Sequence, residues 1–116
     1  MNIISFANTR PYDVYKWSTE YFLHNGCSKN KIQLIHPNAR YNKRAKVIIC
    51  WFIEALQKDI ELINKEDAII ILMDNRETEL ERYGILIADT LRPNKCTDKA
   101  SFTSIISSAC CNLPKS

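Results

Sequence analysis

The sequence predicts a small α/β domain with a short, mainly parallel sheet. The first indication is the run from Ala68 to Met73, in which every position is apolar. A strand that is covered on both faces needs apolar side chains at every position, whereas a half-exposed strand alternates. The second indication is that apolar runs of strand length alternate with stretches of helical periodicity. We therefore expect a two-layer or three-layer domain in the order β-α-β-α-β-α-α.

Length and composition bound the classes of function. The 116 residues are expected to form one domain, residues 1–116, with a single hydrophobic core. The apolar content of 46% and the charged content of 25% are those of an ordinary globular protein. Two glycines are too few for a glycine-rich phosphate loop. The apolar run 47–53 is far shorter than the ~18 residues that span a bilayer, so we expect no membrane segment.

The cysteines favour a reducing compartment. Their number, five, is odd, and no CxxC pair occurs among them. This pattern argues against a disulfide scaffold and against a zinc site. We expect no metal and no cofactor. Because no basic segment followed by a long apolar one is visible at the N-terminus, we also expect a cytoplasmic protein.

The first half of the chain predicts a strand, a helix and a second strand. The strands are expected at residues 2–7 and 31–35. Asn8 or Thr9 should cap the helix between them, and Gly26 should end it in the left-handed conformation. The apolar stripe of this helix consists of Val14, Trp17, Tyr21 and Phe22.

Residues 39–64 have two interpretations. The first is one long helix that begins between Ala39 and Arg44 and ends at Asn64. Its apolar stripe would be Ile49, Phe52, Ile53, Leu56, Ile60 and Ile63. The alternative is a strand from Lys46 to Phe52 followed by a shorter helix. Three strands are few for a parallel sheet, so a fourth strand hidden here, or a second copy pairing with a sheet edge, would complete it.

The remaining patterns predict a strand and two helices. The strand covers residues 68–73, and Asp74 with Glu77 then fits a capping box. The helix that follows should end before Pro93, and a last short helix should begin at Thr97 or Ser101. The apolar positions of the first of these helices are Leu80, Tyr83, Ile87 and Leu91.

Charge is unevenly distributed along the chain. Residues 27–53 contain six basic residues and no acidic one, whereas residues 54–89 contain ten acidic and four basic residues. The candidate polyanion-binding residues are Arg40, Tyr41, Lys43, Arg44 and Lys46. We expect their loop at the carboxyl side of the sheet, with the cations on phosphates and Tyr41 stacked on an unpaired base. The alternative is a solvated loop, or one that pairs with the acidic helices.

Polar side chains that follow the predicted strands define a candidate ligand site at the carboxyl edge of the sheet. Its members are Asn8, Arg10, His36, Asp74 and Arg76. An enzyme acting on a phosphorylated substrate would use Asp74 to hold a metal or His36 to move a proton. The alternative for Asp74 is the helix cap.

The first helix carries more aromatic residues than one buried stripe can absorb. Tyr12, Tyr15 and Lys16 are expected to face outward as a partner interface. We therefore expect a small non-enzymatic interaction or inhibitor module for a protein partner, of the kind that phages and mobile elements carry. The alternatives are nucleic-acid or nucleotide binding through residues 40–46, and an enzyme with Asp74 at the sheet edge. The motifs do not resemble those of a known family.

Overall fold

The structure is a computed structural model that describes residues 2–35, 38–64, 68–74, 76, 82, 90–93 and 96–109. Its strands are β1 (Asn2–Ser5), β2 (Ile32–Ile35), β3 (Val47–Cys50), β4 (Ile69–Leu72) and β5 (Thr90–Leu91). They form one sheet in the order β2-β3-β4-β1-β5, and every pairing is parallel. The predicted α/β class with a mainly parallel sheet is confirmed.

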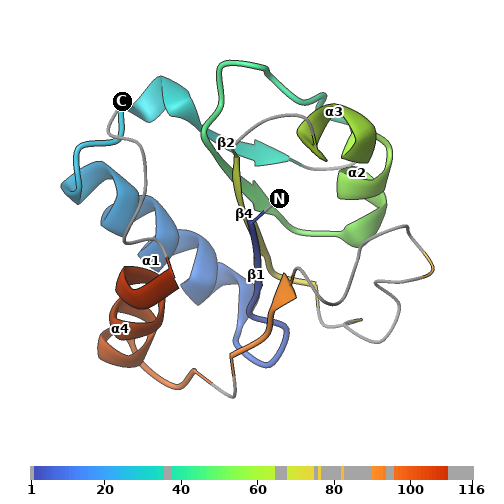
Figure 1. Cartoon of the computed structure of the whole chain (residues 1–116). Helices are drawn as coiled ribbons and strands as arrows, with labels where there is room; N and C mark the ends of the chain where they lie inside the picture. The colour runs from blue at the N-terminus through green and yellow to red at the C-terminus, as the bar shows by residue number, and fades with distance from the viewer. Residues whose placement is uncertain are drawn as a thin grey trace.

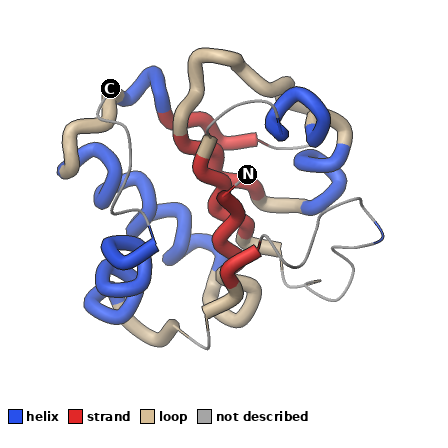
Figure 2. Tube along the Cα trace, viewed as in Figure 1, coloured by secondary structure: helices blue, strands red, loops and turns tan. Residues whose placement is uncertain are grey.

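Helices cover both faces of the sheet, so the domain has three layers (Figure 1). The helices are α1 (Pro11–His24), α2 (Ile53–Gln57), α3 (Ile60–Asn64) and α4 (Lys99–Ala109), with a 3-10 turn, η1 (Lys29–Lys31), before β2. Figure 2 shows the strands running through the middle of the molecule, with α1 and α4 on one side and α2 and α3 on the other.

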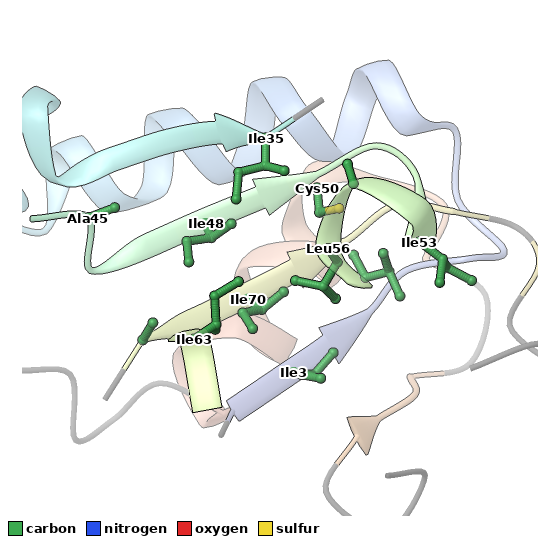
Figure 3. Packing of buried hydrophobic residues seen from close by; sticks show 12 residues of the cluster. Ile3, Ile35, Ala45, Ile48, Cys50, Ile53, Leu56, Ile63 and Ile70 are labelled. Carbon is green, nitrogen blue, oxygen red and sulfur yellow. The ribbon is translucent and has the colours of Figure 1, made fainter. Parts of the chain in front are cut away.

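The central strands explain this layered arrangement. Every residue of β3 and of β4 is buried. Successive side chains of a strand point to opposite faces, so a strand that is buried throughout needs a cover on each face. Ile48 and Ile70 belong to the core under α2 and α3, which Figure 3 shows from close by. Ile49 and Ile71 belong to the core under α1 and α4.

Aromatic rings join α1 and α4 to the sheet. The ring centroid of Phe102, in α4, lies 4.9 Å from that of Phe6 and 5.7 Å from that of Trp17. Val14, Ser18 and Phe22 form the buried side of α1. Trp17 and Tyr21, which were predicted in the buried stripe, are only partly buried against the same core.

The long helix predicted over residues 39–64 is wrong, and the alternative with a strand is confirmed. Residues 47–50 form β3, and two short helices follow it. The residues of the predicted apolar stripe belong to two separate cores. Ile49 packs under α1, whereas Ile53 and Leu56 pack on the opposite face of the sheet. A fully buried strand followed by a buried helix is apolar at nearly every position, so helical spacing also fits it.

The ends of the helices differ in detail from the prediction. The residue before α1 is Arg10, and no side chain caps this helix. Thr9, a predicted cap, instead donates its hydroxyl hydrogen to the carbonyl of Cys96, at 3.2 Å. Gly26 has φ of 90°, which confirms the left-handed end of the first helix.

The C-terminal elements also start at other residues than predicted. The last helix begins at Lys99, because Asp98 accepts the N–H of Ser101 at 2.7 Å. Leu91, expected in a helix, lies in β5 beside Ile4. The other apolar positions of that predicted helix, at 80, 83 and 87, and its capping residue Glu77 lie outside the described residues.

Replacing Phe102 by Ala should destabilise the fold by about 3–5 kcal/mol, because the ring is fully buried between α4, α1 and the sheet. Urea unfolding followed by circular dichroism would measure the loss. The matched control is Leu23→Ala, at an exposed position of α1, which should cost less than about 1 kcal/mol. Equal losses for the two variants would contradict the docking of α4 described here.

Candidate functional site

Asp74 lies at the carboxyl end of β4 and is only 4% exposed. Its Oδ2 accepts the N–H of Ile53, the first residue of α2, at 2.9 Å. Its Oδ1 accepts the N–H of Arg76, also at 2.9 Å. Asp74 therefore caps α2, a helix that precedes it by about twenty positions in the sequence. The predicted capping box at the helix after Asp74 lies outside the described residues.

Arg76 completes the surroundings of this carboxylate. Its Nε donates to Oδ1 of Asp74 at 3.1 Å, and one terminal nitrogen donates to Oδ2 at 2.7 Å. Both terminal nitrogens also donate to the carboxylate of Glu54, on α2. The guanidinium thus joins the end of β4 to the first turn of α2 through two carboxylates.

The hydrogen bonds decide the ionisation of Asp74. Burial alone would raise the pKa of its carboxyl, but the bonds from Arg76 and from the N–H of Ile53 outweigh burial and lower the pKa below 3.8. Glu54 and Asp74 in turn raise the pKa of Arg76. Both oxygens of Asp74 have two donors, and among the described residues no group of three His, Cys, Asp or Glu side chains could hold a metal ion.

The hydrogen bonds of Asp74 go to Ile53 and Arg76, and not to Asn8 or Arg10, two further members of the predicted carboxyl-edge site. Asn8 and Arg10 follow β1, and the Nε of Arg10 donates to Asp13 at 3.0 Å. His36 lies outside the described residues. A cavity of about 170 Å³ lies at this turn, and Asp74 and Arg76 are not part of its lining. Its walls are Asn8, Thr9, Arg10, Asp13, Trp17, Cys96 and Thr97.

The basic loop lies at the edge of the sheet opposite to the one expected. The N–H of Lys46 donates to the carbonyl of Lys31 at 2.8 Å, and the carbonyl of Lys46 accepts the N–H of Ile69 at 2.9 Å. Both contacts are at the point where β2, β3 and β4 begin. The loop ends at this amino edge because it returns the chain from the end of β2 to the start of a parallel β3.

Tyr41 is held against the core rather than presented to a ligand. Its side chain packs on the cluster under α2 and α3, and its backbone N–H donates to Oδ2 of the buried Asp59 at 3.1 Å. Arg40, Lys43 and Arg44 are exposed, and Lys46 is half-buried. The loop therefore offers cations, but its tyrosine is not placed for stacking on a base.

Tyr12 and Lys16 face outward from α1, as predicted, and Tyr12 is 67% exposed. Tyr15 is half-buried and packs on Trp51, with ring centroids 6.4 Å apart. Phe52 follows Trp51 at the carboxyl end of β3 and is 47% exposed. We call Tyr12, Tyr15, Trp51 and Phe52 the aromatic rim.

The exposure of Phe52 and the contact of the half-buried Trp51 with Tyr15 were missed because the predicted long helix included both residues. The signal that could have placed them is the change of pattern after Cys50, where a short buried strand ends and a helix begins at Ile53. Under that interpretation Trp51 and Phe52 become the connection at the carboxyl edge. Side chains in such connections lie at the surface more often than those of buried strands.

No protein-family model, curated protein or solved structure matches the chain. Among the described residues, no helix is both long enough and apolar enough to cross a membrane.

Replacing Asp74 by Asn should destabilise the protein by about 2–3 kcal/mol at pH 7, because Arg76 and the N–H of Ile53 would lose their shared carboxylate. The pKa of Asp74 is lower in the folded state than in the unfolded state. The contribution of Asp74 to the free energy of unfolding is therefore complete above pH 3.8, and it is lost as the pH falls through the folded-state pKa. Urea unfolding of both proteins at pH 7 and near pH 3 would measure the difference, which should shrink at the lower pH.

The control for this prediction is Asp13→Asn. Asp13, in the first turn of α1, pairs with the exposed Arg10 just before this helix, so its replacement should cost less than about 1 kcal/mol. A loss for Asp74→Asn that is no larger than for the control, or that stays constant down to pH 2.5, would refute the role assigned to Asp74.

Proposed function

We propose that the protein is a small interaction module that binds a protein partner through the aromatic rim. The observations that support this proposal are the ring contact between Tyr15 and Trp51 and the exposure of Tyr12, three residues before Tyr15, and of Phe52, which directly follows Trp51 in the chain. Aromatic residues are enriched in protein interfaces and often contribute most of the binding energy. An inhibitor carried by a phage or mobile element is one form that such a module could take.

The rim is attached to rigid elements, which supports a role in binding. Tyr12 and Tyr15 lie in the first two turns of α1, three residues apart, and so project from the same side of the helix. Trp51 and Phe52 directly follow β3, whose residues are all buried. Side chains that are ordered before binding lose less conformational entropy when a partner docks.

The rim also has a cation beside it. Lys16 is exposed one residue after Tyr15, and none of the ion pairs between described residues includes it. A basic group at the border of an interface increases the rate of association with an acidic partner more than it increases the affinity. We therefore expect the partner to carry acidic residues around an apolar centre.

The two alternatives receive unequal support. The enzyme hypothesis gains none from Asp74, because both of its oxygens bind Ile53 and Arg76 within the fold. The nucleic-acid hypothesis concerns another surface and is favoured by one observation. Arg40, Lys43, Arg44 and Lys46 take part in none of the ion pairs between described residues.

A cytoplasmic location is part of the proposal. The thiol of the buried Cys50 donates to the carbonyl of Phe52 at 2.9 Å, and the thiol of Cys96 donates to the carbonyl of Asp98 at 3.5 Å. Burial raises the pKa of Cys50 to about 12, so this residue stays protonated and unreactive. Thiols used as small core residues are compatible with a reducing compartment.

The test is affinity capture from the native host with the wild-type protein and with Tyr12→Ala/Phe52→Ala. The wild type should recover a stoichiometric partner, and the rim variant should bind that partner at least about tenfold more weakly, because aromatic anchors of interfaces cost this much when truncated. Isothermal titration with the purified partner would give the ratio. Both substituted residues are exposed, so the melting temperature should change little.

The control variant is Leu23→Ala/Leu62→Ala. These two residues are also exposed and apolar but lie at the end of α1 and on α3, away from the rim. Their replacement should leave the affinity within about twofold of wild type. A partner lost by the control and kept by the rim variant would contradict the proposal. So would capture of a second copy of this chain alone, which would indicate pairing along a sheet edge such as β2.

A further inference from the structure

Two segments that carry six basic residues lie at and beside the amino edge of the sheet, at the opposite end of β3 from the aromatic rim. We call these six residues the basic surface, and they are Lys29, Lys31, Arg40, Lys43, Arg44 and Lys46. Lys31 ends η1 and is joined to Lys46 by a backbone hydrogen bond of 2.8 Å. The other residues belong to η1 and to the loop that leads to Lys46. The polypeptide thus brings two basic segments, 29–31 and 40–46, side by side.

The loop that carries most of these cations is anchored to the fold at several points. The side-chain nitrogen of Gln33, in β2, donates to the carbonyl of Arg40 at 2.6 Å, and its oxygen accepts the N–H of Asn42 at 2.8 Å. Asp59 accepts the N–H of Tyr41, and the side chain of Ala45 is buried in the core under α2 and α3 (Figure 3). Because the backbone of the loop is fixed in this way, binding would cost little backbone entropy.

The cations of the basic surface have no acidic partner among the described residues. None of the ion pairs between described residues includes any of the six, and no acidic residue occurs between positions 27 and 53. Lys29, Arg40, Lys43 and Arg44 are exposed, whereas Lys31 and Lys46 are half-buried. A cluster of like charges repels itself, and a polyanion would relieve that repulsion.

The position of Tyr41 determines which polyanion fits best. Proteins that bind single strands without sequence preference stack successive bases on exposed aromatic rings. Tyr41 is the one aromatic residue between positions 38 and 46, and it packs against the core. The basic surface therefore offers cations for phosphates but no exposed ring for a base, and phosphates are most closely spaced in a duplex, at about one charge per 1.7 Å of helix axis.

We infer that the basic surface binds the phosphate backbone of double-stranded nucleic acid, without reading its sequence. The inference concerns a surface separate from the aromatic rim and does not depend on the protein partner proposed above. About four phosphate contacts from the exposed cations would give weak binding that decreases steeply with salt. Because no base edge is read, all duplex sequences should bind alike.

The experiment is fluorescence anisotropy with labelled DNA duplex, RNA duplex and single-stranded DNA, each of about 20 nucleotides per strand, at about 50 and 200 mM salt. At the lower salt both duplexes should bind more tightly than the single strand. With four contacts, the duplex affinity should fall on the order of a hundredfold between the two salt concentrations. Preference for the single strand, or an affinity that does not change with salt, would overturn the inference.

Two charge-reversal variants with equal net charge show whether duplex binding depends on the basic surface or only on the net charge of the protein. Lys43→Glu/Arg44→Glu changes the basic surface, and Arg92→Glu/Lys99→Glu changes exposed cations after β5 and in α4, so each lowers the net charge from +3 to −1. The first should weaken duplex binding by at least about tenfold, and the second by no more than about threefold. Circular dichroism should show that both variants are folded.

Equal losses in the two variants would overturn the inference, because they would show an effect of net charge only. Polyglutamate serves as a competitor with a different backbone. It should displace the duplex only at a much higher concentration of charge, since its carboxylates are not spaced along a rigid helix. Displacement at the same concentration of charge would also overturn the assignment to nucleic acid, in favour of an acidic protein segment.

Discussion

The complete burial of the parallel pair β3 and β4 is the constraint on which the rest of the structure depends. Strands with side chains buried on both faces need a cover on both faces, so the chain must place helices on each side of the sheet. Parallel pairing also requires every connection to return from the carboxyl edge to the amino edge. The surfaces proposed for binding are consequences of these two requirements, because they lie where the chain turns at the two edges of the sheet.

The carboxyl edge shows why a polar residue at the end of a strand is not by itself a site. The carboxylate of Asp74 accepts an N–H at the start of α2. Arg76 forms ion pairs with this carboxylate and with that of Glu54. The first turn of the helix would otherwise leave this N–H without a partner in a buried place. The hydrogen-bonding capacity of both Asp74 oxygens is therefore used within the fold.

The sequence was sufficient for the fold class and insufficient for the contacts. The apolar run at β4 identified a doubly covered strand, and Gly26 identified the end of the first helix. β3 was hidden because a buried strand and the buried helix after it share one continuous apolar pattern. The caps of α2 and the packing of Tyr41 involve residues about twenty positions apart, and local patterns carry no information on such pairs. The exposure of Tyr12 was predictable because helical spacing separates it from the buried positions.

The distance between the two edges decides how the proposed surfaces would act together. Lys46 and Phe52 bracket β3, and an extended segment of this length spans about 20 Å. This exceeds the Debye length of about 8 Å at physiological salt, so charges bound at one edge are largely screened from the other. A protein on the aromatic rim and a duplex on the basic surface would therefore bind without strong coupling. Occupying both surfaces would hold the two ligands at a fixed separation, set by the rigid central strands.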